Sequence, residues 1–308
     1  MMKAFLIIVI TGMLLLAAGW FSLTYYANHP GPLSDTTIIM IEPGDSFDEI
    51  TDQLAEQKAI SFPLLFKAWV VAHGLHHQFK AGEFELEKDI TPDAIIDILV
   101  GGKSIQHSVT VPEGLISKDI LTIVRDTKLL TGDPPASLPE GTLLPETYYF
   151  LRNTSRTEII RRMQDAMRRT LDTAWQGRDQ NLPFTTKEEA LILASIVEKE
   201  TGIAEERPHV ASVFVNRLRQ NMKLQSDPTT LYGVYAKTGE LKQSLTFKDL
   251  EQSTPYNTYV IEGLPPGPIC HPGKESIQAV LHPTDTRDLY FVATGTGGHA
   301  RLPKPIGT

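Results

Sequence analysis

The chain has a single cysteine, Cys270, among its 308 residues. One thiol excludes an intramolecular disulfide and any metal site built from several cysteines. Basic side chains are also in the minority, with 29 Lys and Arg against 37 Asp and Glu and a formal net charge of −8. Because a general nucleic-acid-binding protein needs a basic face, this composition argues against nucleic acid as a partner.

Long uncharged stretches are absent after residue 27, but one precedes it. Residues 4–23 read AFLIIVITGMLLLAAGWFSL and contain no charged side chain over 20 positions. As a helix, this segment would be about 30 Å long, which matches the hydrocarbon core of a bilayer. We expect an uncleaved transmembrane anchor here. A cleaved signal peptide is the alternative, and the length of the apolar core argues against it.

The ends of this segment predict its orientation. Lys3 and the amino terminus precede it, so the positive-inside rule makes residues 1–3 the cytoplasmic end. Trp20, Tyr25 and Tyr26 lie where an interfacial belt of aromatic side chains is expected. The rest of the chain would then be one ectodomain outside the cytoplasmic membrane.

The ectodomain divides into segments of different character. Residues 24–37 contain two prolines and a glycine and are predicted to be a linker. Residues 38–106 alternate short strand and helix patterns, with Ser46 and Glu49 spaced as a capping box. Residues 107–308 form a larger domain that includes a long amphipathic helix. The fold class that we expect is α+β.

A strongly apolar helix is predicted to begin at Thr186, which forms a capping box with Glu189. Residues 190–197 are apolar on every side except at Ser195. A helix of this kind is normally buried in the middle of a domain.

Glu198 and Glu200 follow directly and point about 200° apart, so they cannot face one cleft. A carboxyl group at a helix C-terminus beside an apolar stripe should have a raised pKa, as the general acid of glycoside cleavage requires. Two alternatives stay open. Lys199 can pair with either glutamate and lower its pKa, or both glutamates mark the point where a core helix reaches the surface.

Two later segments, LQSDPTTLYG and STPYNTYVIEGLPPGPICHPG, are dense in polar, aromatic and turn residues. Sugar sites use aromatic faces for the rings and amide or hydroxyl groups for the ring hydroxyls. An ordinary loop rich in proline and glycine is the alternative. The candidate substrate contacts are Gln225, Asp227, Tyr256, Asn257, Thr258 and Tyr259.

Several segments together resemble the MltG (YceG-like) family of endolytic murein lytic transglycosylases. They are KAGEFEL, VTVPEGL, LLPETYYF, LASIVEKET, VASVFVNRL, LQSDPTTLYG, YNTYVIEGLPPGPI and LYFVATGTGGHA. Their order and spacing carry the resemblance from about residue 38 to residue 299. After His299 the chain reads ARLPKPIGT in place of the family's usual continuation. We therefore expect the closing C-terminal element to be missing or replaced.

The resemblance implies a LysM-like module at residues 38–106 and a catalytic domain at residues 107–308. It implies an inner-membrane protein that crosses the membrane once and whose C-terminal ectodomain lies in the periplasm. Its partners would be peptidoglycan glycan strands and peptidoglycan synthases. The reaction would cut the MurNAc–GlcNAc bond, leave 1,6-anhydro-MurNAc ends and help to terminate glycan elongation.

The resemblance also implies the catalytic group. The second glutamate of the family's EKET motif is the acid, and it maps onto Glu200, with Glu198 as the alternative. No metal or cofactor is implied, because a hydroxyl group of the sugar acts as the nucleophile.

Two other classes of protein stay open. A muramidase-type hydrolase would use Glu200 with a second acid such as Asp227 and would leave a reducing sugar. A non-catalytic, membrane-anchored peptidoglycan-binding protein would act through residues 38–106 alone. The long remainder of the chain, with its buried glutamate helix, argues against this second class.

We predict that the full chain stays in the membrane fraction after carbonate washing, because residues 4–23 are long enough to span the bilayer. Immunoblotting of the washed membranes measures this. A soluble mature form that begins near Trp20 or Phe21 would show that the segment is a signal peptide.

Overall fold

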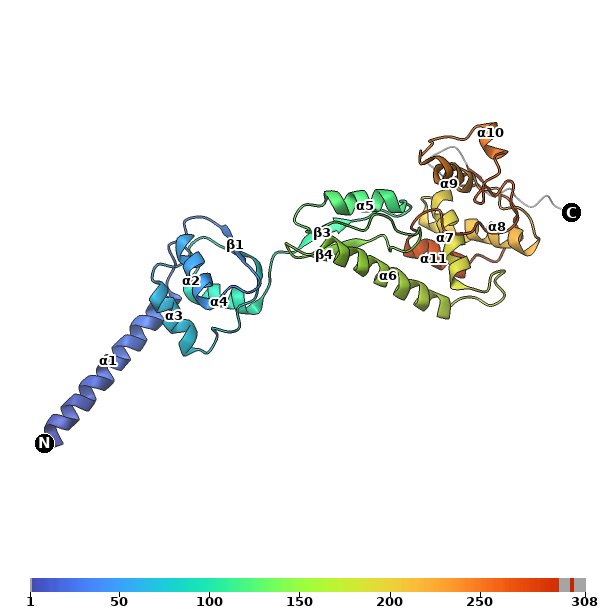
Figure 1. The fold of residues 1–308 in the computed structure, drawn as a ribbon. Helices are drawn as coiled ribbons and strands as arrows, with labels where there is room; N and C mark the ends of the chain where they lie inside the picture. The colour runs from blue at the N-terminus through green and yellow to red at the C-terminus, as the bar shows by residue number, and fades with distance from the viewer. Residues whose placement is uncertain (1, 294–299, 302–308) are drawn as a thin grey trace. The chain divides into compact units, whose positions relative to one another are not determined.

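The computed structural model describes residues 2–293 and 300–301, so His299 lies outside the described residues. It divides into two compact units, Met1–His107 and Ser108–Thr308, and each is described by itself (Figure 1). Helices and short two-stranded sheets occur together, which confirms the α+β prediction.

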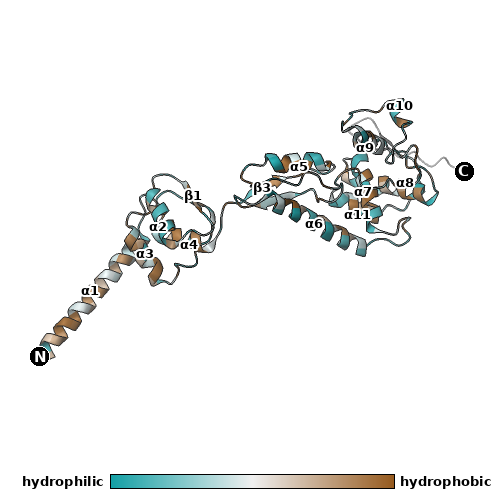
Figure 2. Ribbon diagram, viewed as in Figure 1, coloured by the Kyte–Doolittle hydropathy of each residue, from teal (hydrophilic) through white to brown (hydrophobic). Residues whose placement is uncertain are grey.

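The apolar N-terminal segment forms helix α1 (Met2–Asn28), whose 27 residues extend about 40 Å. Within the described part of the chain, α1 is the helix that is long and apolar enough to cross a membrane (Figure 2). The helix continues past residues 4–23 into the segment that we predicted to be a linker. Its last turns are held by side-chain hydrogen bonds, from Thr24 Oγ1 to the Trp20 carbonyl (2.8 Å) and from Asn28 Nδ2 to the Thr24 carbonyl (2.9 Å).

The first unit contains one antiparallel strand pair, β1 (Thr37–Ile41) and β2 (Gly82–Leu86). Helices α2 (Phe47–Glu56) and α3 (Pro63–Ala72) lie between these strands in sequence, and α4 (Pro92–Gly101) follows. One hydrophobic core joins the elements. Its fully buried members include Ala27, Ile39, Leu54, Phe66, Phe84 and Leu99.

The capping box predicted for the start of α2 is confirmed. Ser46 Oγ accepts from the Glu49 amide at 3.2 Å, and the Glu49 carboxylate accepts from the Ser46 amide at 2.7 Å. These two bonds satisfy backbone donors that the first turn of a helix otherwise leaves unpaired.

The second unit is mainly helical. Two short strands, β3 (His107–Thr110) and β4 (Thr147–Phe150), pair beside its first helix. Its other elements are α5 (Ser117–Asp126), α6 (Arg156–Gln176), α7 (Lys187–Glu200), the 3₁₀ turn η1 (Ala204–Glu206), α8 (Arg207–Arg219), α9 (Asp227–Thr238), α10 (Phe247–Leu250), α11 (Lys274–Leu281) and the strands β5 (Val292–Ala293) and β6 (Ala300–Arg301).

Helix α6 joins the two hydrophobic cores of this unit. Ile159, Ile160 and Met163 pack with α5 and the β3–β4 pair, whereas Met167 and Leu171 pack with α7, α8 and α11. All five side chains are buried, as their helical spacing predicts. Helix α7 lies within the second core, and its residues 190–197 are buried apart from a partly exposed Ile192.

The side chain of Arg156 fastens the start of α6 to the end of α5. All five of its hydrogen bonds go to backbone carbonyls. The acceptors are Val124 (2.9 Å), Arg125 (2.9 Å), Thr127 (3.0 Å), Leu130 (2.8 Å) and Gly132 (2.7 Å). The last carbonyls of a helix have no partner within it, and a guanidinium group has five N–H donors in a fixed fork.

We predict that Arg156→Lys destabilises the chain by roughly 2–4 kcal/mol, because an ammonium group has three donors and cannot reach five carbonyls. Urea unfolding measures this. Arg161→Lys, on the exposed side of the same helix, is the matched control and should stay within about 0.5 kcal/mol of the unmodified chain. Equal stability of the two variants would contradict the role of Arg156.

Candidate active site

The C-terminal turn of α7 places its two glutamates in different surroundings. The helix begins with the predicted capping box, in which Thr186 Oγ1 accepts from the Glu189 amide at 3.2 Å and Glu189 Oε2 accepts from the Thr186 amide at 3.0 Å. It ends at Glu200. Because each residue is rotated by about 100°, Glu198 and Glu200 leave the helix on nearly opposite sides.

Glu198 is held by structural contacts, and its side chain is only 5% exposed. Its Oε2 accepts from the amide of Gly273, the N-cap residue of α11 (2.9 Å), and from Ser276 Oγ in the first turn of that helix (2.7 Å). Its Oε1 accepts from Arg207 Nη2 at 3.3 Å. A carboxylate at a helix N-terminus is stabilised by free N–H groups and by the helix dipole. Glu198 therefore joins α7 to α11 and pairs with a buried cation.

Lys199 lies between the two glutamates in sequence. Its ammonium group donates to the Gly114 carbonyl at 3.2 Å. This contact is to the segment before α5, and among the described residues no ion pair joins Lys199 to either glutamate.

Glu200 is largely buried, and its Oε1 accepts a 2.5 Å hydrogen bond from Ser226 Oγ. Burial raises the pKa of Glu200 above its ordinary value. The Ser226 hydroxyl opposes this shift, the negative charge of Asp227 adds to it, and the positive charge of Arg217 opposes it. The net result is a carboxyl group that keeps its proton at a higher pH than an exposed glutamate does.

The Ser226 hydroxyl is fixed in place by the fold. Ser226 is the N-cap residue of α9, but its side chain makes no cap hydrogen bond to that helix. Its amide donates to Thr258 Oγ1 at 2.9 Å, and its carbonyl accepts from Thr229 Oγ1 at 2.7 Å. The hydroxyl is therefore left to donate to Glu200.

Three of the predicted substrate residues lie around Glu200. Tyr259 Oη donates to Asp227 Oδ1 at 2.6 Å. Gln225 has a positive φ of 49°, and its amide donates to the Thr258 carbonyl at 3.2 Å. This conformation is unfavourable for a residue with a side chain and persists only where the surroundings hold it. The side chains of Gln225 and Asp227 are exposed. Gln225 Oε1 accepts from Arg217 Nη1 at 3.4 Å and Asp227 Oδ1 accepts from Tyr259, so the Gln225 amide nitrogen and Asp227 Oδ2 are the atoms available to a ligand.

The other three predicted contacts have different surroundings. Asn257 and Thr258 are fully buried. Asn257 Nδ2 donates to three backbone carbonyls, and its Oδ1 accepts from Thr230 Oγ1 at 2.9 Å. The Thr258 hydroxyl accepts from the Ser226 amide. These two side chains fix the loop and are not placed to touch a ligand. Tyr256 packs edge-to-face on Tyr232, with ring centroids 4.8 Å apart.

Cys270 offers no reactive thiol. It is buried, its Sγ donates to the Ser195 carbonyl at 3.3 Å, and burial raises the pKa of the thiol well above its ordinary value. Within residues 2–293 and 300–301, no three His, Cys, Asp or Glu side chains are arranged to hold a metal ion, so we assign no metal ligand.

A family model described as YceG-like family matches residues 39–301. The chain belongs to the YceG-like family. It is 33% identical to a Bacillus subtilis protein named endolytic murein transglycosylase, over 86% of this chain and 81% of that protein. It is 28% identical to a Streptococcus pneumoniae protein of the same name, over 96% of this chain and 62% of that protein. A crystal structure of a yceG-like protein from Listeria monocytogenes is 29% identical and similar in fold, with a TM-score of 0.51, over 89% of this chain and 97% of that one.

Two residues of this YceG-like site were not predicted from the sequence. One is Ser226, whose hydroxyl contacts Glu200. The other is Arg217, which is 7% exposed and donates to the Leu289 carbonyl (2.7 Å) and the Leu224 carbonyl (2.8 Å). An arginine within the apolar run VASVFVNRL was the available signal, because a buried arginine requires partners.

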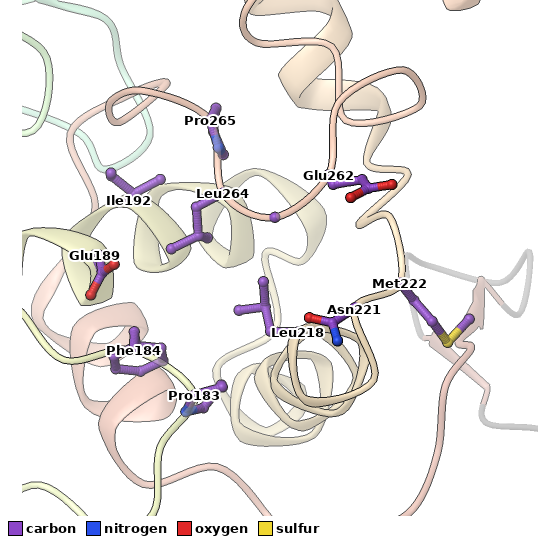
Figure 3. Close-up of a pocket in the computed structure, with 11 residues that line it drawn as sticks. Pro183, Phe184, Glu189, Ile192, Leu218, Asn221, Met222, Glu262, Leu264 and Pro265 are labelled. Carbon is purple, nitrogen blue, oxygen red and sulfur yellow. The ribbon is translucent and has the colours of Figure 1, made fainter.

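One cavity of about 420 Å³ is lined by Phe184 and Glu189 at the start of α7, by Leu218 at the end of α8, and by Glu262 and Leu264 of the later loop (Figure 3). Its lining does not include Glu200. Catalysis at Glu200 would therefore take place outside this cavity.

We predict that Glu200→Gln makes the chain more stable at neutral pH than the unmodified chain. The folded chain holds the Glu200 proton more tightly than the unfolded chain, so the unfolding free energy falls as pH rises from about 4.5 through the raised pKa. Glutamine has no such proton to lose. Thermal unfolding in detergent at pH 4 and pH 7 should show equal stability at pH 4 and a gain at pH 7. A constant difference between the variants at both pH values would contradict a raised pKa.

Proposed function

We propose that this chain is an endolytic murein transglycosylase in which Glu200 is the single acid and base. The observation that carries the proposal is the largely buried Glu200 carboxyl, whose hydrogen-bond donor among the described residues is the neutral hydroxyl of Ser226. The relatives from B. subtilis and S. pneumoniae bear the name of this activity. Glu198 is fully engaged with α11 and Arg207, which argues against it as the acid.

The reaction follows from one protonated carboxyl group. Glu200 donates its proton to the oxygen between MurNAc and GlcNAc, and the bond from that oxygen to C1 of MurNAc breaks. The carboxylate that remains takes the proton of the MurNAc C6 hydroxyl, and O6 closes onto C1. The products are a new GlcNAc hydroxyl and a 1,6-anhydro-MurNAc end. The proton returns to Glu200, and no water is consumed.

The surrounding residues suit this sequence of steps. The Ser226 hydroxyl orients the carboxyl group and supports its charged form in the middle of the reaction. The exposed Asp227 carboxylate, held by Tyr259, offers negative charge near the positive charge that develops at C1. Gln225 and Tyr259 are the proposed contacts to the sugar, and Tyr256 is a more distant one.

Asp227 also favours the second candidate, a muramidase-type hydrolase. A hydrolase needs a second carboxylate to activate water or to form a covalent intermediate, and Asp227 is the acid whose charge acts on Glu200. The two reactions differ in their products, because hydrolysis leaves a reducing end and transglycosylation leaves an anhydro end.

The rest of the chain supports a site of action at the membrane. We infer that α1 is a single-pass anchor in the inner membrane, with Lys3 on the cytoplasmic side and both units in the periplasm. We propose that residues 38–106 are a LysM-like module that binds glycan strands and that residues 107–308 are the catalytic domain. Cleavage of strands near the membrane would terminate their elongation, with peptidoglycan synthases as neighbours.

We predict that Glu200→Gln lowers the rate of anhydro-end formation by at least 10²- to 10⁴-fold, the range expected for loss of a general acid–base group. Glutamine keeps the volume and can accept from Ser226, but it cannot deliver a proton. Mass spectrometry of muropeptides released from purified peptidoglycan measures the product.

Glu198→Gln is the matched control. It keeps the hydrogen-bond acceptors of α11 but weakens the pair with Arg207, so it should cost stability and retain activity in the folded fraction. Activity that survives Glu200→Gln but not Glu198→Gln, with both chains folded, would reverse the assignment. Reducing ends in place of anhydro ends would favour the hydrolase.

A further inference from the structure

A groove of about 490 Å³ lies between α5 and α9 in the second unit. Leu121 and Leu138 line its apolar part, and Tyr232 and Tyr235 line the α9 side with ring centroids 5.8 Å apart. Neither tyrosine hydroxyl has a hydrogen-bond partner among the described residues. The groove therefore combines two aromatic rings with two hydroxyl groups that can serve a ligand.

Cations line the α5 side of this groove. Lys118 and Arg125 are exposed, and neither forms an ion pair with another residue that the structure describes. Glu140 also lines the groove, but its Oε2 accepts from the Ser117 amide (2.9 Å) and Ser117 Oγ (3.1 Å). Lys118 and Arg125 therefore present positive charge at the groove, in a chain whose formal net charge is −8.

The groove is connected to the candidate active site through α9. This helix begins at Asp227, beside Glu200, and Tyr235 lies eight residues further on, which is about 12 Å along the axis. A ligand bound at Glu200 could therefore reach the groove if it were an extended chain of sugars. Burial, with the nearby charge of Glu140, raises the pKa of the Tyr232 and Tyr235 hydroxyls, so both stay protonated and can donate to sugar oxygens.

We propose that this groove is a distal subsite for the same glycan strand that is cut at Glu200. Tyr232 and Tyr235 would contact the faces and amide oxygens of N-acetyl sugars, and Lys118 and Arg125 would pair with carboxylates of the stem peptides. This inference rests on the proposed function, since it takes peptidoglycan as the ligand. It predicts tighter binding of long, peptide-bearing strands than of a single disaccharide-peptide.

The test measures binding to the full chain in detergent, with Glu200→Gln present so that nothing is cut. Tyr235→Ala should weaken binding of long glycan strands about tenfold and leave binding of a disaccharide-peptide unchanged, because stacking on an aromatic ring is lost. Tyr235→Phe, which keeps the ring, should retain most of the affinity. Tyr149→Ala removes an exposed tyrosine of β4 that does not line the groove, so it is the matched control.

The role of Lys118 and Arg125 is tested separately. The double variant Lys118→Ser, Arg125→Ser should weaken binding of peptide-bearing strands about three- to tenfold and make it less dependent on salt. Strands stripped of peptide by an amidase should bind this variant and the parent chain equally. Lys128→Ser with Arg161→Ser changes the charge by the same amount away from the groove and should have no effect.

The outcomes distinguish the two proposals. If the parent chain binds no glycan strand, peptidoglycan is not the ligand and the proposed function fails. If the parent chain binds long strands and the groove variants bind them equally well, the function stands and the distal subsite is wrong. An equal loss on long strands and on the disaccharide-peptide would also overturn the subsite, because it would place Tyr235 at the cleavage site or in the general fold.

Discussion

Polar groups that a fold carries into its interior need partners there, because burial of a polar group without a hydrogen bond is costly. Helix α7 is under this constraint, because residues 190–197 pack into the core that α6, α8 and α11 share. Its last turn carries two carboxyl groups into the interior. An unpaired buried charge costs several kcal/mol, so each carboxyl must be given partners or keep its proton. The two glutamates of this turn, Glu198 and Glu200, differ in which of these two outcomes applies.

Glu198 is given partners for its charge, whereas burial favours the protonated form of Glu200. Glu198 accepts from two donors at the start of α11 and from the buried cation Arg207, so its charge is matched. Among the described residues, Glu200 accepts from the neutral hydroxyl of Ser226, and burial favours the protonated form of its carboxyl group. Two residues of the same type, two positions apart, thus acquire a structural and a chemical role from the donors that surround them.

Helix α9 carries residues of both the candidate active site and the groove. Its N-cap residue, Ser226, directs its hydroxyl to Glu200 instead of to the helix, and its first residue, Asp227, is held by Tyr259. Further along, Tyr232 and Tyr235 face the groove beside α5. One rigid helix therefore sets the spacing between the acid and the tyrosines of the groove. The other side of the groove is formed by α5, whose end is held by the hydrogen bonds of Arg156.

Short-range patterns in the sequence determined much of this protein. The capping boxes at Ser46 and Thr186, the apolar face of α6 and the buried body of α7 all depend on residues within a few positions of one another, so they could be predicted and are confirmed. The N-terminal helix was predicted too, although its end at Asn28 was not, because the final turns depend on packing of Ala27 in the core of the first unit.

The roles of the polar residues were decided only by the tertiary structure. Composition indicated a sugar site in the run from Tyr256 to Tyr259, but it could not show that Asn257 points inward and Tyr259 towards Asp227. Two of the three donors of Glu198 lie 75 and 78 positions further along the chain, and the donor of Glu200 lies 26 positions further. A pKa depends on such distant neighbours and on burial, and the fold alone brings them together.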